Sequence, residues 1–348
     1  MAKEPIMVEA LLYERLEKNA VRCNLCSHRC TIKEGQRGRC SVRENRGGTL
    51  TSLVYGRLVA AASDPVEKKP IWHLAPGSLS YSVASVGCNF SCSFCQNAEI
   101  SQLAPDENGL PGMAATPEET VAEALAAGAR SIAFTYTEPT VAFEFVLDTA
   151  RLARKKGLFT ILVTNGYLTF EAIDLLAPHL TSANVDLKAF TEEFYTRYCR
   201  ASLEPVKDAI LYLKQKGVAL EITTLLIPGL NDGAGEIKKI ARFIAGGPGV
   251  DTPWHLSRFY PTYRMTDHPP TPMETILMAR DIGIEAGLRY VYTGNLPHNT
   301  GENTFCYGCG KAVIQRSGYR LMAVDIKDNR CSFCGTYIDG IDIDGQTS

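Results

Sequence analysis

The 348-residue sequence lacks any uninterrupted apolar run long enough to cross a bilayer, about 18 residues, so we expect no membrane-spanning helix. It also lacks an excess of one charge, because 36 Lys or Arg residues face 38 Asp or Glu residues. This balance gives no electrostatic case for binding nucleic acid or an anionic membrane. Residues 1–20 carry both charge signs and lack the apolar core of a signal peptide, so we expect a cytoplasmic protein.

The twelve cysteines are the most informative feature of the composition. Eleven of them fall into three groups, and Cys199 stands alone; the groups are Cys23, Cys26, Cys30 and Cys40; Cys88, Cys92 and Cys95; and Cys306, Cys309, Cys331 and Cys334. A disulfide framework fits poorly, because the chain is long, has no secretion signal and clusters its cysteines at short gaps. The pattern favours metal binding in a reducing cytoplasm.

The middle of the chain alternates β-branched apolar runs with helical segments. We expect strands at Tyr81–Val86, Ser131–Tyr136, Phe159–Val163, Ala183–Leu187, Ala219–Ile227, His255–Phe259 and Arg289–Tyr292. Helices are expected from Thr116 onward and at roughly 139–156, 169–177, 203–216, 234–245 and 271–286. Six or seven such βαβ units favour an α/β fold with a complete or partial (β/α) TIM-type barrel, although a doubly wound sheet has the same local pattern.

Polar residues recur at or just past the ends of these strands, which favours the barrel, whose active sites form at that face. They are Cys88, Glu138, Asn165, Asp186, Lys188, Arg258 and Asn295. Asp64-Pro65, Glu67–Pro70 and Trp72-His73 precede the second cysteine group and are candidates for a substrate entrance, or for a solvated loop. His255, Arg258 and Tyr260 are candidates for the substrate side of the cavity.

The second cysteine group is a CxxxCxxC loop directly after the first expected strand. Three thiolates from one loop can hold three irons of a [4Fe–4S] cube and leave the fourth iron open. A zinc site with an unrelated fourth ligand is the alternative. The loop resembles the signature of the radical S-adenosylmethionine (SAM) superfamily, in which an aromatic residue, here Phe94, precedes the last cysteine. The resemblance implies that SAM chelates the open iron and is cleaved reductively to a 5′-deoxyadenosyl radical, which abstracts hydrogen from a substrate.

Further motifs resemble the SAM-contacting positions of that superfamily. Thr137-Glu138-Pro139 resembles the end of its GGEP motif, with Tyr136 and Thr137 in place of the glycines. Thr164 and Asn165 resemble a TNG motif, and Asp186-Leu187-Lys188 resembles a DLK motif. A helix N-cap carboxylate is the structural alternative for Glu138, and a salt-bridged strand end is the alternative for Asp186 and Lys188. No residue is assigned as catalytic.

The outer cysteine groups suggest further metal sites. The two CxxC pairs of the last group fit a structural zinc ribbon, with an auxiliary iron–sulfur cluster as the alternative. Their segment, 301–348, holds five Lys or Arg residues against six Asp or Glu residues, which speaks against nucleic acid. The first group suits zinc or a second cluster equally, and His28 could replace one ligand. Cys199 is interpreted as a small buried residue.

Nearly the whole chain resembles the AmmeMemoRadiSam system radical SAM family, within the pyruvate formate-lyase activating enzyme-like group. The blocks that carry this resemblance include Cys23–Cys30, Gly38-Arg39-Cys40, Glu67–Pro70, Asn184–Lys188, Tyr292–Asn295 and Gly301–Thr304. It implies AMMECR-like and Memo-like partner proteins, and a reductant such as a flavodoxin or ferredoxin.

The organisation that we expect has four parts. They are a Cys-rich segment (1–50) that opens with a helix-like stretch around Leu11, Leu12 and Leu16, a β-rich connector (51–80), the barrel (81–300) and the ribbon-like tail (301–348). The expected function is SAM-dependent hydrogen abstraction from an unidentified small molecule, lipid or peptide. An activase that installs a radical on a protein, or a non-catalytic metal-binding scaffold, are the alternatives.

Overall fold

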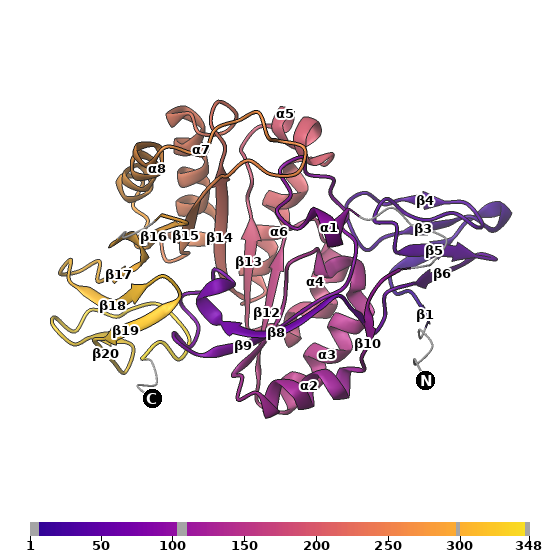
Figure 1. Cartoon of the computed structure of the whole chain (residues 1–348), viewed down its shortest axis with the longest axis horizontal. Helices are drawn as coiled ribbons and strands as arrows, with labels where there is room; N and C mark the ends of the chain where they lie inside the picture. The colour runs from indigo at the N-terminus through magenta and orange to yellow at the C-terminus, as the bar shows by residue number, and fades with distance from the viewer. Residues whose placement is uncertain (1–6, 103–109, 297–299, 345–348) are drawn as a thin grey trace.

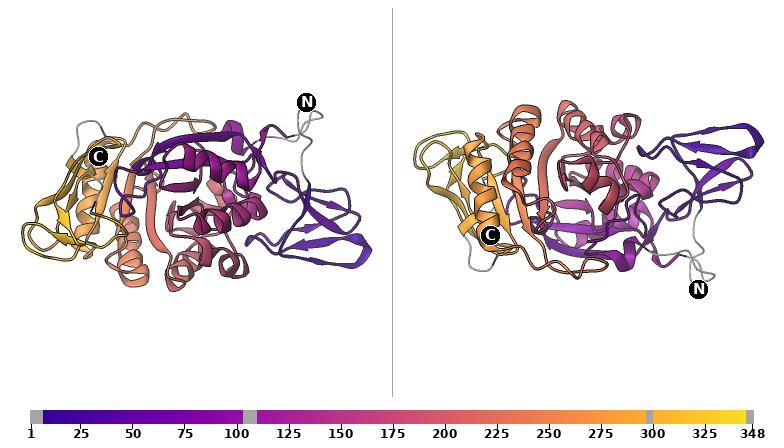
Figure 2. Two further views of the ribbon diagram at one scale, coloured as in Figure 1. Left: turned by 90° about the horizontal axis from the view of Figure 1, so that it is seen from below. Right: turned by 90° about the horizontal axis from the view of Figure 1, so that it is seen from above.

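The computed structural model describes residues 7–102, 110–296 and 300–344 (Figure 1). Small antiparallel sheets come first, a large mostly parallel sheet with helices follows, and short antiparallel strands end the chain. The N-terminal sheets and the C-terminal strands lie at opposite ends of the molecule, with the large sheet between them (Figures 1 and 2).

The large sheet has eight strands among the described residues, in the spatial order β16-β15-β14-β13-β12-β11-β9-β8. They are β8 (Ala60–Pro65), β9 (Leu79–Ala84), β11 (Ser131–Phe134), β12 (Phe159–Thr164), β13 (Ser182–Asp186), β14 (Ala219–Leu226), β15 (Trp254–Arg258) and β16 (Val291–Gly294). Neighbours pair in parallel except β8, which runs antiparallel to β9. Because β16 and β8 stand at the two ends of the order, the described sheet is a partial barrel, without the strand-order reversal of a doubly wound fold.

Helices follow the parallel strands and lie outside the curved sheet (Figure 2). The α-helices are α1 (Ala98–Ser101), α2 (Pro117–Ala126), α3 (Phe143–Lys155), α4 (Phe170–Leu176), α5 (Glu192–Phe194), α6 (Glu204–Gln215), α7 (Ala234–Ile244) and α8 (Met273–Glu285). α2 starts with the predicted capping box, in which Thr116 and Glu119 exchange hydrogen bonds. In the described chain, no helix is long and apolar enough to span a membrane.

All seven strands predicted for the barrel are present, with ends within two residues of the prediction. The helix expected over 139–156 is divided into a 3-10 turn (Pro139–Ala142) and α3. The prediction worked here because each unit buries a strand and one helix face, so the apolar pattern repeats with the period of each element. Sheet order and the antiparallel edge strand depend on distant pairing, which the local pattern does not contain.

The N-terminal region forms two three-stranded sheets, β1-β6-β5 and β2-β3-β4. Their strands are β1 (Val8–Glu9), β2 (Tyr13–Arg15), β3 (Val21–Cys23), β4 (Thr31–Ile32), β5 (Arg43–Arg46) and β6 (Thr49–Ser52). The helix-like stretch expected around Leu11, Leu12 and Leu16 is wrong. Leu12 and Lys18 have φ angles of +54° and +57°, which interrupt a right-handed helix, and β2 pairs with β3 instead.

The tail packs against the connector between the N-terminal sheets and the barrel. It contains β17 (Thr304–Phe305), β18 (Ala312–Ser317), β19 (Arg320–Val324), β20 (Ile326–Lys327) and β21 (Arg330–Cys331). Outside the tail, the short strands β7 (Arg57–Leu58) and β10 (Met113–Ala114) pair with each other. Arg316 on β18 pairs with Glu67 at 3.5 Å, and both side chains are fully buried. Arg316 also donates to Trp72 O at 3.0 Å. Because an unpaired buried charge is costly, this contact anchors the tail beside the barrel.

Candidate active site and cysteine centres

The loop after β9 carries three cysteines and faces a cavity of about 730 Å³. Cys88, Cys92 and Cys95 all line this cavity. Gly87, at the start of the loop, has a φ of +99°, and a Cβ at this position would lie 2.8 Å from Val42 Cγ1. Glycine is therefore required both by the backbone conformation and by the close N-terminal segment.

A π-helical turn, Tyr195–Cys199, supports the loop from behind. The backbone N–H of Ser91 donates to Cys199 O at 3.0 Å. Cys199 is fully buried, as predicted. This residue does more than fill space, because its carbonyl oxygen holds the backbone of the cysteine loop.

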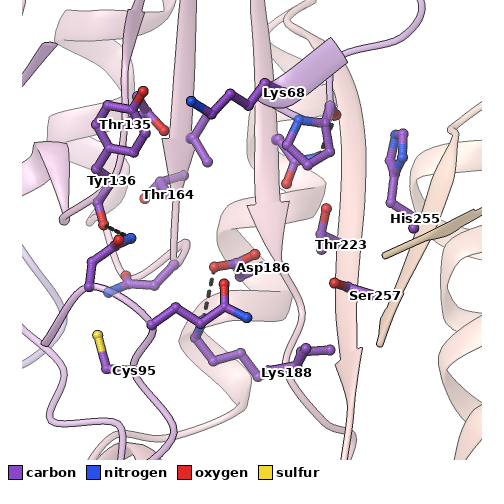
Figure 3. A pocket seen from close by; sticks show the side chains of 18 of the residues that line it. Lys68, Cys95, Thr135, Tyr136, Thr164, Asp186, Lys188, Thr223, His255 and Ser257 are labelled. Carbon is purple, nitrogen blue, oxygen red and sulfur yellow. Dashed lines mark hydrogen bonds and ion pairs between the residues drawn. The ribbon is translucent and has the colours of Figure 1, made fainter. Parts of the chain in front are cut away.

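Side chains from five parallel strands, or from the turns that follow them, line the same cavity. They are Glu138 after β11, Asn165 after β12, Asp186 at the end of β13, Thr223 in β14 and Asn295 after β16. Figure 3 shows Asp186 and Thr223 on neighbouring strands, with Cys95 on the loop nearby. Parallel strands bring their carboxyl ends to one edge, so residues from across the barrel meet the loop there.

Glu138 joins the ends of two strands and is 2% exposed. Its Oε1 accepts from Thr140 N at 3.0 Å, Thr140 Oγ1 at 2.5 Å and Thr164 Oγ1 at 2.8 Å, and its Oε2 accepts from Asn165 N at 2.8 Å. Burial raises the pKa of Glu138, and these donors oppose the rise. The N-cap role considered for Glu138 is present, and Oε2 is the oxygen with capacity for a further donor.

Asn165 continues this network to the cysteine loop. Its Nδ2 donates to Asn89 Oδ1 at 2.7 Å and lies 3.7 Å from Cys88 Sγ. Asn89 and Cys88 are adjacent in the chain, so one amide contacts both the side chain of Asn89 and the thiol of Cys88. The end of β12 therefore positions the loop as well as lining the cavity.

Tyr136 occupies a glycine-like conformation, with a φ of +67°. Its carbonyl accepts from Asn97 Nδ2 at 2.8 Å, and its hydroxyl contacts Asp64 and Lys69, the latter at 3.0 Å. A left-handed conformation is unfavourable for a tyrosine, so these contacts hold the strained residue in place. The turn before Glu138 thus keeps a conformation that glycine would adopt readily.

Asp186 and Lys188 form an ion pair at the cavity wall, with Nζ and Oδ2 2.9 Å apart (Figure 3). Burial alone would lower the pKa of Lys188, but the Asp186 carboxylate raises it well above its ordinary value. The ammonium therefore stays charged. Nζ also lies 5.9 Å from the ring centre of Phe94, whose side chain is buried beside the loop thiols.

The other side of the cavity is lined by the connector and the tail. Lys68, Pro70 and Trp72 come from the connector, and Glu302 and Tyr319 come from the tail. The three connector residues belong to the segments considered for a substrate entrance or a solvated loop, and they face the cavity. The contribution of the tail was not predicted, because the sequence does not show that this segment folds back against the cavity.

Of the strand residues expected on the substrate side, His255 lines the cavity, whereas Arg258 and Tyr260 are not among the lining residues. Side chains alternate along a strand, and His255 and Ser257 face inward, so Arg258 faces the other way. Its Nε donates to Thr271 O at 2.7 Å. The expectation for Arg258 is therefore wrong by the register of the strand, and Tyr260 lies beyond the end of β15 with an exposed side chain.

Glu221 is a residue that the sequence reasoning missed. It lies in β14 and is 2% exposed. One carboxylate oxygen lies 2.6 Å from His255 Nε2, and the other accepts from the backbone N–H groups of Trp72 and His73 at 2.8 and 2.9 Å. Glu221 therefore joins the connector to the strand below the cavity. The available signal was the one charged residue inside the strand expected at Ala219–Ile227.

Asn184 in β13 was also missed, and it faces the cavity directly. Its Nδ2 donates to Pro70 O at 2.8 Å, while its Oδ1 is buried and has no hydrogen-bond partner. Buried polar atoms are usually satisfied, so an unpaired acceptor in a cavity wall indicates a place where a ligand donates.

The tail cysteines converge closely. Cys306, Cys309, Cys331 and Cys334 have sulfur atoms within 4.8 Å of one another, including separations of 3.6 and 3.8 Å. Four thiolates about 2.3 Å from one zinc ion would be about 3.8 Å apart. Across the described residues, this is the one group of three or more His, Cys, Asp or Glu ligand atoms that meets that limit. The four thiols can therefore bind one metal ion.

The N-terminal cysteines are arranged differently. Cys23, Cys26, Cys30 and Cys40 line a second, smaller cavity between the N-terminal sheets and the barrel. His28, considered as a replacement ligand, also lies at this cavity, but its Nε2 forms a hydrogen bond with Asn89 O at 2.7 Å. The histidine therefore connects the N-terminal region to the loop of Cys88.

Comparisons with known proteins agree with this site. The profile of the Radical SAM superfamily matches residues 82–244, which include the cysteine loop and most of the parallel strands. The uncharacterized protein MJ0808 of Methanocaldococcus jannaschii is 44% identical over 335 residues, 96% of this chain and 99% of that protein. The similarity thus extends over the N-terminal cysteines and the tail.

More distant similarities cover the barrel. Pyruvate formate-lyase 1-activating enzyme of Escherichia coli K12 is 26% identical over 165 residues, 45% of this chain and 65% of that enzyme. The crystal structure of Streptococcus suis SuiB bound to S-adenosylmethionine covers 67% of this chain and 53% of SuiB, with a TM-score of 0.50 and 13% identity. The structural likeness supports the fold alone.

Proposed function

Because the chain belongs to the radical SAM superfamily and is a radical SAM enzyme, we propose that Cys88, Cys92 and Cys95 hold its [4Fe–4S] cluster in the 730 Å³ cavity. The observation that carries the proposal is that all three thiols of one loop line that cavity. They are not gathered as tightly as the ligands of one ion, which suits binding to three different irons. When bound, the cluster and SAM supply the radical that takes hydrogen from the substrate.

The surrounding residues fit SAM, which carries an amino group, a carboxylate and a sulfonium. Lys188, kept charged by Asp186, offers a cation, and Asp186 and the free capacity of Glu138 offer anionic acceptors. Asn184 Oδ1 is a buried acceptor without a partner in the same wall. We assign Thr164 and Asn165 to positioning, because their hydrogen bonds fix Glu138 and the cysteine loop.

The size of the cavity favours a small substrate. A volume of about 730 Å³ lies in the range of small-molecule sites, roughly 300–1,000 Å³, and it must also hold SAM. Lys68, Trp72, His255 and Tyr319 also line this cavity. We therefore infer that the substrate is a small molecule. The second candidate function is a radical activase, for which one protruding side chain of a protein loop would enter the cavity.

We also propose that the chain belongs to one family within the superfamily, the AmmeMemoRadiSam system radical SAM enzymes. The 44% identity to a relative of matching length supports a family whose members share nearly the whole chain, which is compatible with the AmmeMemoRadiSam resemblance. We infer that the tail cysteines hold zinc, since their sulfur separations match a tetrahedral site.

The test is an anaerobic assay of the reconstituted, reduced protein with SAM, in which 5′-deoxyadenosine is measured. The Cys88→Ala/Cys92→Ala/Cys95→Ala variant should form none. The matched control is Cys309→Ala/Cys334→Ala, which removes two thiols of the tail and should keep nucleoside formation. Two results would overturn the proposal. One is a wild-type protein that holds a reducible four-iron cluster but forms no 5′-deoxyadenosine, and the other is a triple variant that forms as much as wild type.

A further inference from the structure

The cavity between the N-terminal sheets and the barrel is lined by all four N-terminal cysteines. Cys23 ends β3, Cys26 and Cys30 lie in the turn between β3 and β4, and Cys40 precedes β5. Residues from the barrel side, including Asn89, complete the wall. Four thiols from separate parts of one small domain therefore point to a single enclosed site.

The spacing of these thiols distinguishes between the metals that they could bind. A single zinc ion would bring four sulfur atoms to about 3.8 Å from one another, as the tail cysteines show. No three of the N-terminal thiols, all of which are described, lie within 4.8 Å of one another. In a [4Fe–4S] cluster each thiolate binds a different iron, so the sulfur atoms stand further apart around a larger core.

The wall of this cavity also carries unsatisfied donors. Arg43 is 1% exposed, and its Nε and Nη1 have no hydrogen-bond partner, while its Nη2 pairs with Glu144 at 2.5 Å. Asn89 Nδ2 is likewise buried without a partner. Buried donors without partners are costly, and a cluster with four thiolates presents anionic sulfur acceptors. The wall therefore fits an anionic group that the four thiols would hold.

We propose that Cys23, Cys26, Cys30 and Cys40 hold a second [4Fe–4S] cluster, which passes electrons to the cluster at Cys88, Cys92 and Cys95. The relay role rests on the proposed function of the barrel site. Since every iron would have a thiolate ligand, no position is open for SAM or substrate, which suits electron transfer alone. In each step a reduced carrier of the flavodoxin or ferredoxin class loses one electron to the N-terminal cluster, which then returns to its oxidised state by reducing the barrel cluster.

The two sites are in direct contact through the loop that follows β9. Asn89 lines the N-terminal cavity, and its neighbour Cys88 lines the barrel cavity. A Cβ at Gly87 would lie 3.1 Å from the carbonyl oxygen of Cys40. The ligand loops of the two sites thus pack against each other, and a short route for an electron exists between them.

The decisive experiment uses the Cys88→Ala/Cys92→Ala/Cys95→Ala variant, which leaves the N-terminal cysteines intact. Wild type should hold about eight iron atoms per chain and this variant about four. The iron in the variant should give the EPR signal of a reduced [4Fe–4S] cluster that SAM does not change. A variant without iron that holds a second zinc ion would overturn the assignment. If SAM left the EPR signal of the wild-type protein unchanged, the proposed function would be contradicted instead. The second cluster and the proposed function therefore fail by different results.

The relay is tested with Cys26→Ser/Cys40→Ser, compared with Cys309→Ser/Cys334→Ser as a cysteine-loss control. With a flavodoxin as donor, the first variant should lose 5′-deoxyadenosine formation while the control keeps it. With dithionite, a small reductant that reaches the barrel cluster directly, the first variant should recover formation, which also shows that the barrel is folded. Equal rates with flavodoxin in wild type and in a variant that lacks the N-terminal iron would overturn the relay.

Discussion

The cysteine loop of the barrel and the cysteines of the tail use the same side chain in opposite ways. The tail brings four sulfur atoms within 4.8 Å of one another, and two of its cysteines are exposed. The loop spreads three thiols along a large cavity that is lined by charged and polar groups. Convergence of the sulfur atoms indicates a closed structural ion, whereas three thiols facing open space indicate a cofactor that must bind something else.

The largest expected effect separates the two regions by metal content. In Cys309→Ala/Cys334→Ala we expect loss of zinc and local unfolding of the turns that carry the four cysteines, since structural zinc contributes on the order of 10 kcal/mol to such small domains. β18, which the buried Arg316–Glu67 pair holds to the connector, should stay folded beside the cavity, and iron at the barrel loop should remain. Metal analysis would measure both metals, and hydrogen exchange of β21 and β18 amides would measure how far unfolding spreads. Loss of iron together with zinc would contradict independent sites.

A glycine in each region tests how tightly the neighbouring chain packs. Gly87 and Gly310 both have positive φ angles, but a Cβ would meet Val42 at 2.8 Å only at Gly87, with nothing within 4 Å at Gly310. Gly310→Ala should lower the free energy of unfolding by about 1 kcal/mol. Gly87→Ala should cost roughly 1–3 kcal/mol more through overpacking, and should reduce iron loading. If chemical denaturation gave the same loss of unfolding free energy for both variants, the N-terminal segment would be able to move away from the added methyl group at no cost.

The ion pair beside the loop should affect SAM binding more than stability. Asp186→Asn leaves the mostly buried Lys188 without its partner, and we expect SAM affinity to fall by about tenfold, or roughly 1.4 kcal/mol. Glu204→Gln breaks the more exposed pair with Lys207 and should change neither affinity nor stability by more than about 0.5 kcal/mol. Equilibrium binding of SAM to the reconstituted proteins provides the measurement. Unchanged affinity in Asp186→Asn would remove this pair from the SAM site.

The smallest expected effect concerns acid stability of the turn before Glu138. Burial would raise the pKa of Asp64, but hydrogen bonds from Lys68, Lys69 and Tyr136 bring it well below its ordinary value. A depressed pKa stabilises the fold above the unfolded value, near 3.9, and this stability is lost as the pH falls below it. Between pH 6 and pH 3, wild type should therefore lose about 1 kcal/mol more than Asp64→Asn. Denaturant titrations at each pH would measure the unfolding free energy, and the same pH dependence in wild type and Asp64→Asn would contradict the prediction.

The sequence predicted the repeating part of the fold well, because each βα unit shows its own apolar period. It could not show that β8 closes one edge antiparallel, nor that the tail folds back so that Tyr319 lines the cavity. Those contacts join distant segments, and no local pattern encodes them.

In the candidate site, too, residues that belong to a local motif could be predicted and residues defined by distant contacts could not. Cys88, Cys92 and Cys95 are identifiable because they are adjacent and regularly spaced. Glu221 and Asn184 were missed because their importance depends on partners from other strands and from the connector. Arg258 was misplaced by the alternation of a single strand, an error of one residue that reverses the direction of a side chain.

The most direct test of the central claim asks whether SAM binds the cluster of the barrel loop. The reduced wild-type protein would be studied by electron–nuclear double resonance with SAM labelled with ¹⁵N and ¹⁷O in its methionyl amino and carboxylate groups. We expect hyperfine coupling from both labels, absent in the Cys88→Ala/Cys92→Ala/Cys95→Ala variant and retained in Cys309→Ala/Cys334→Ala. Bound, labelled SAM that shows no coupling to any reduced four-iron cluster of the wild-type protein would contradict the account.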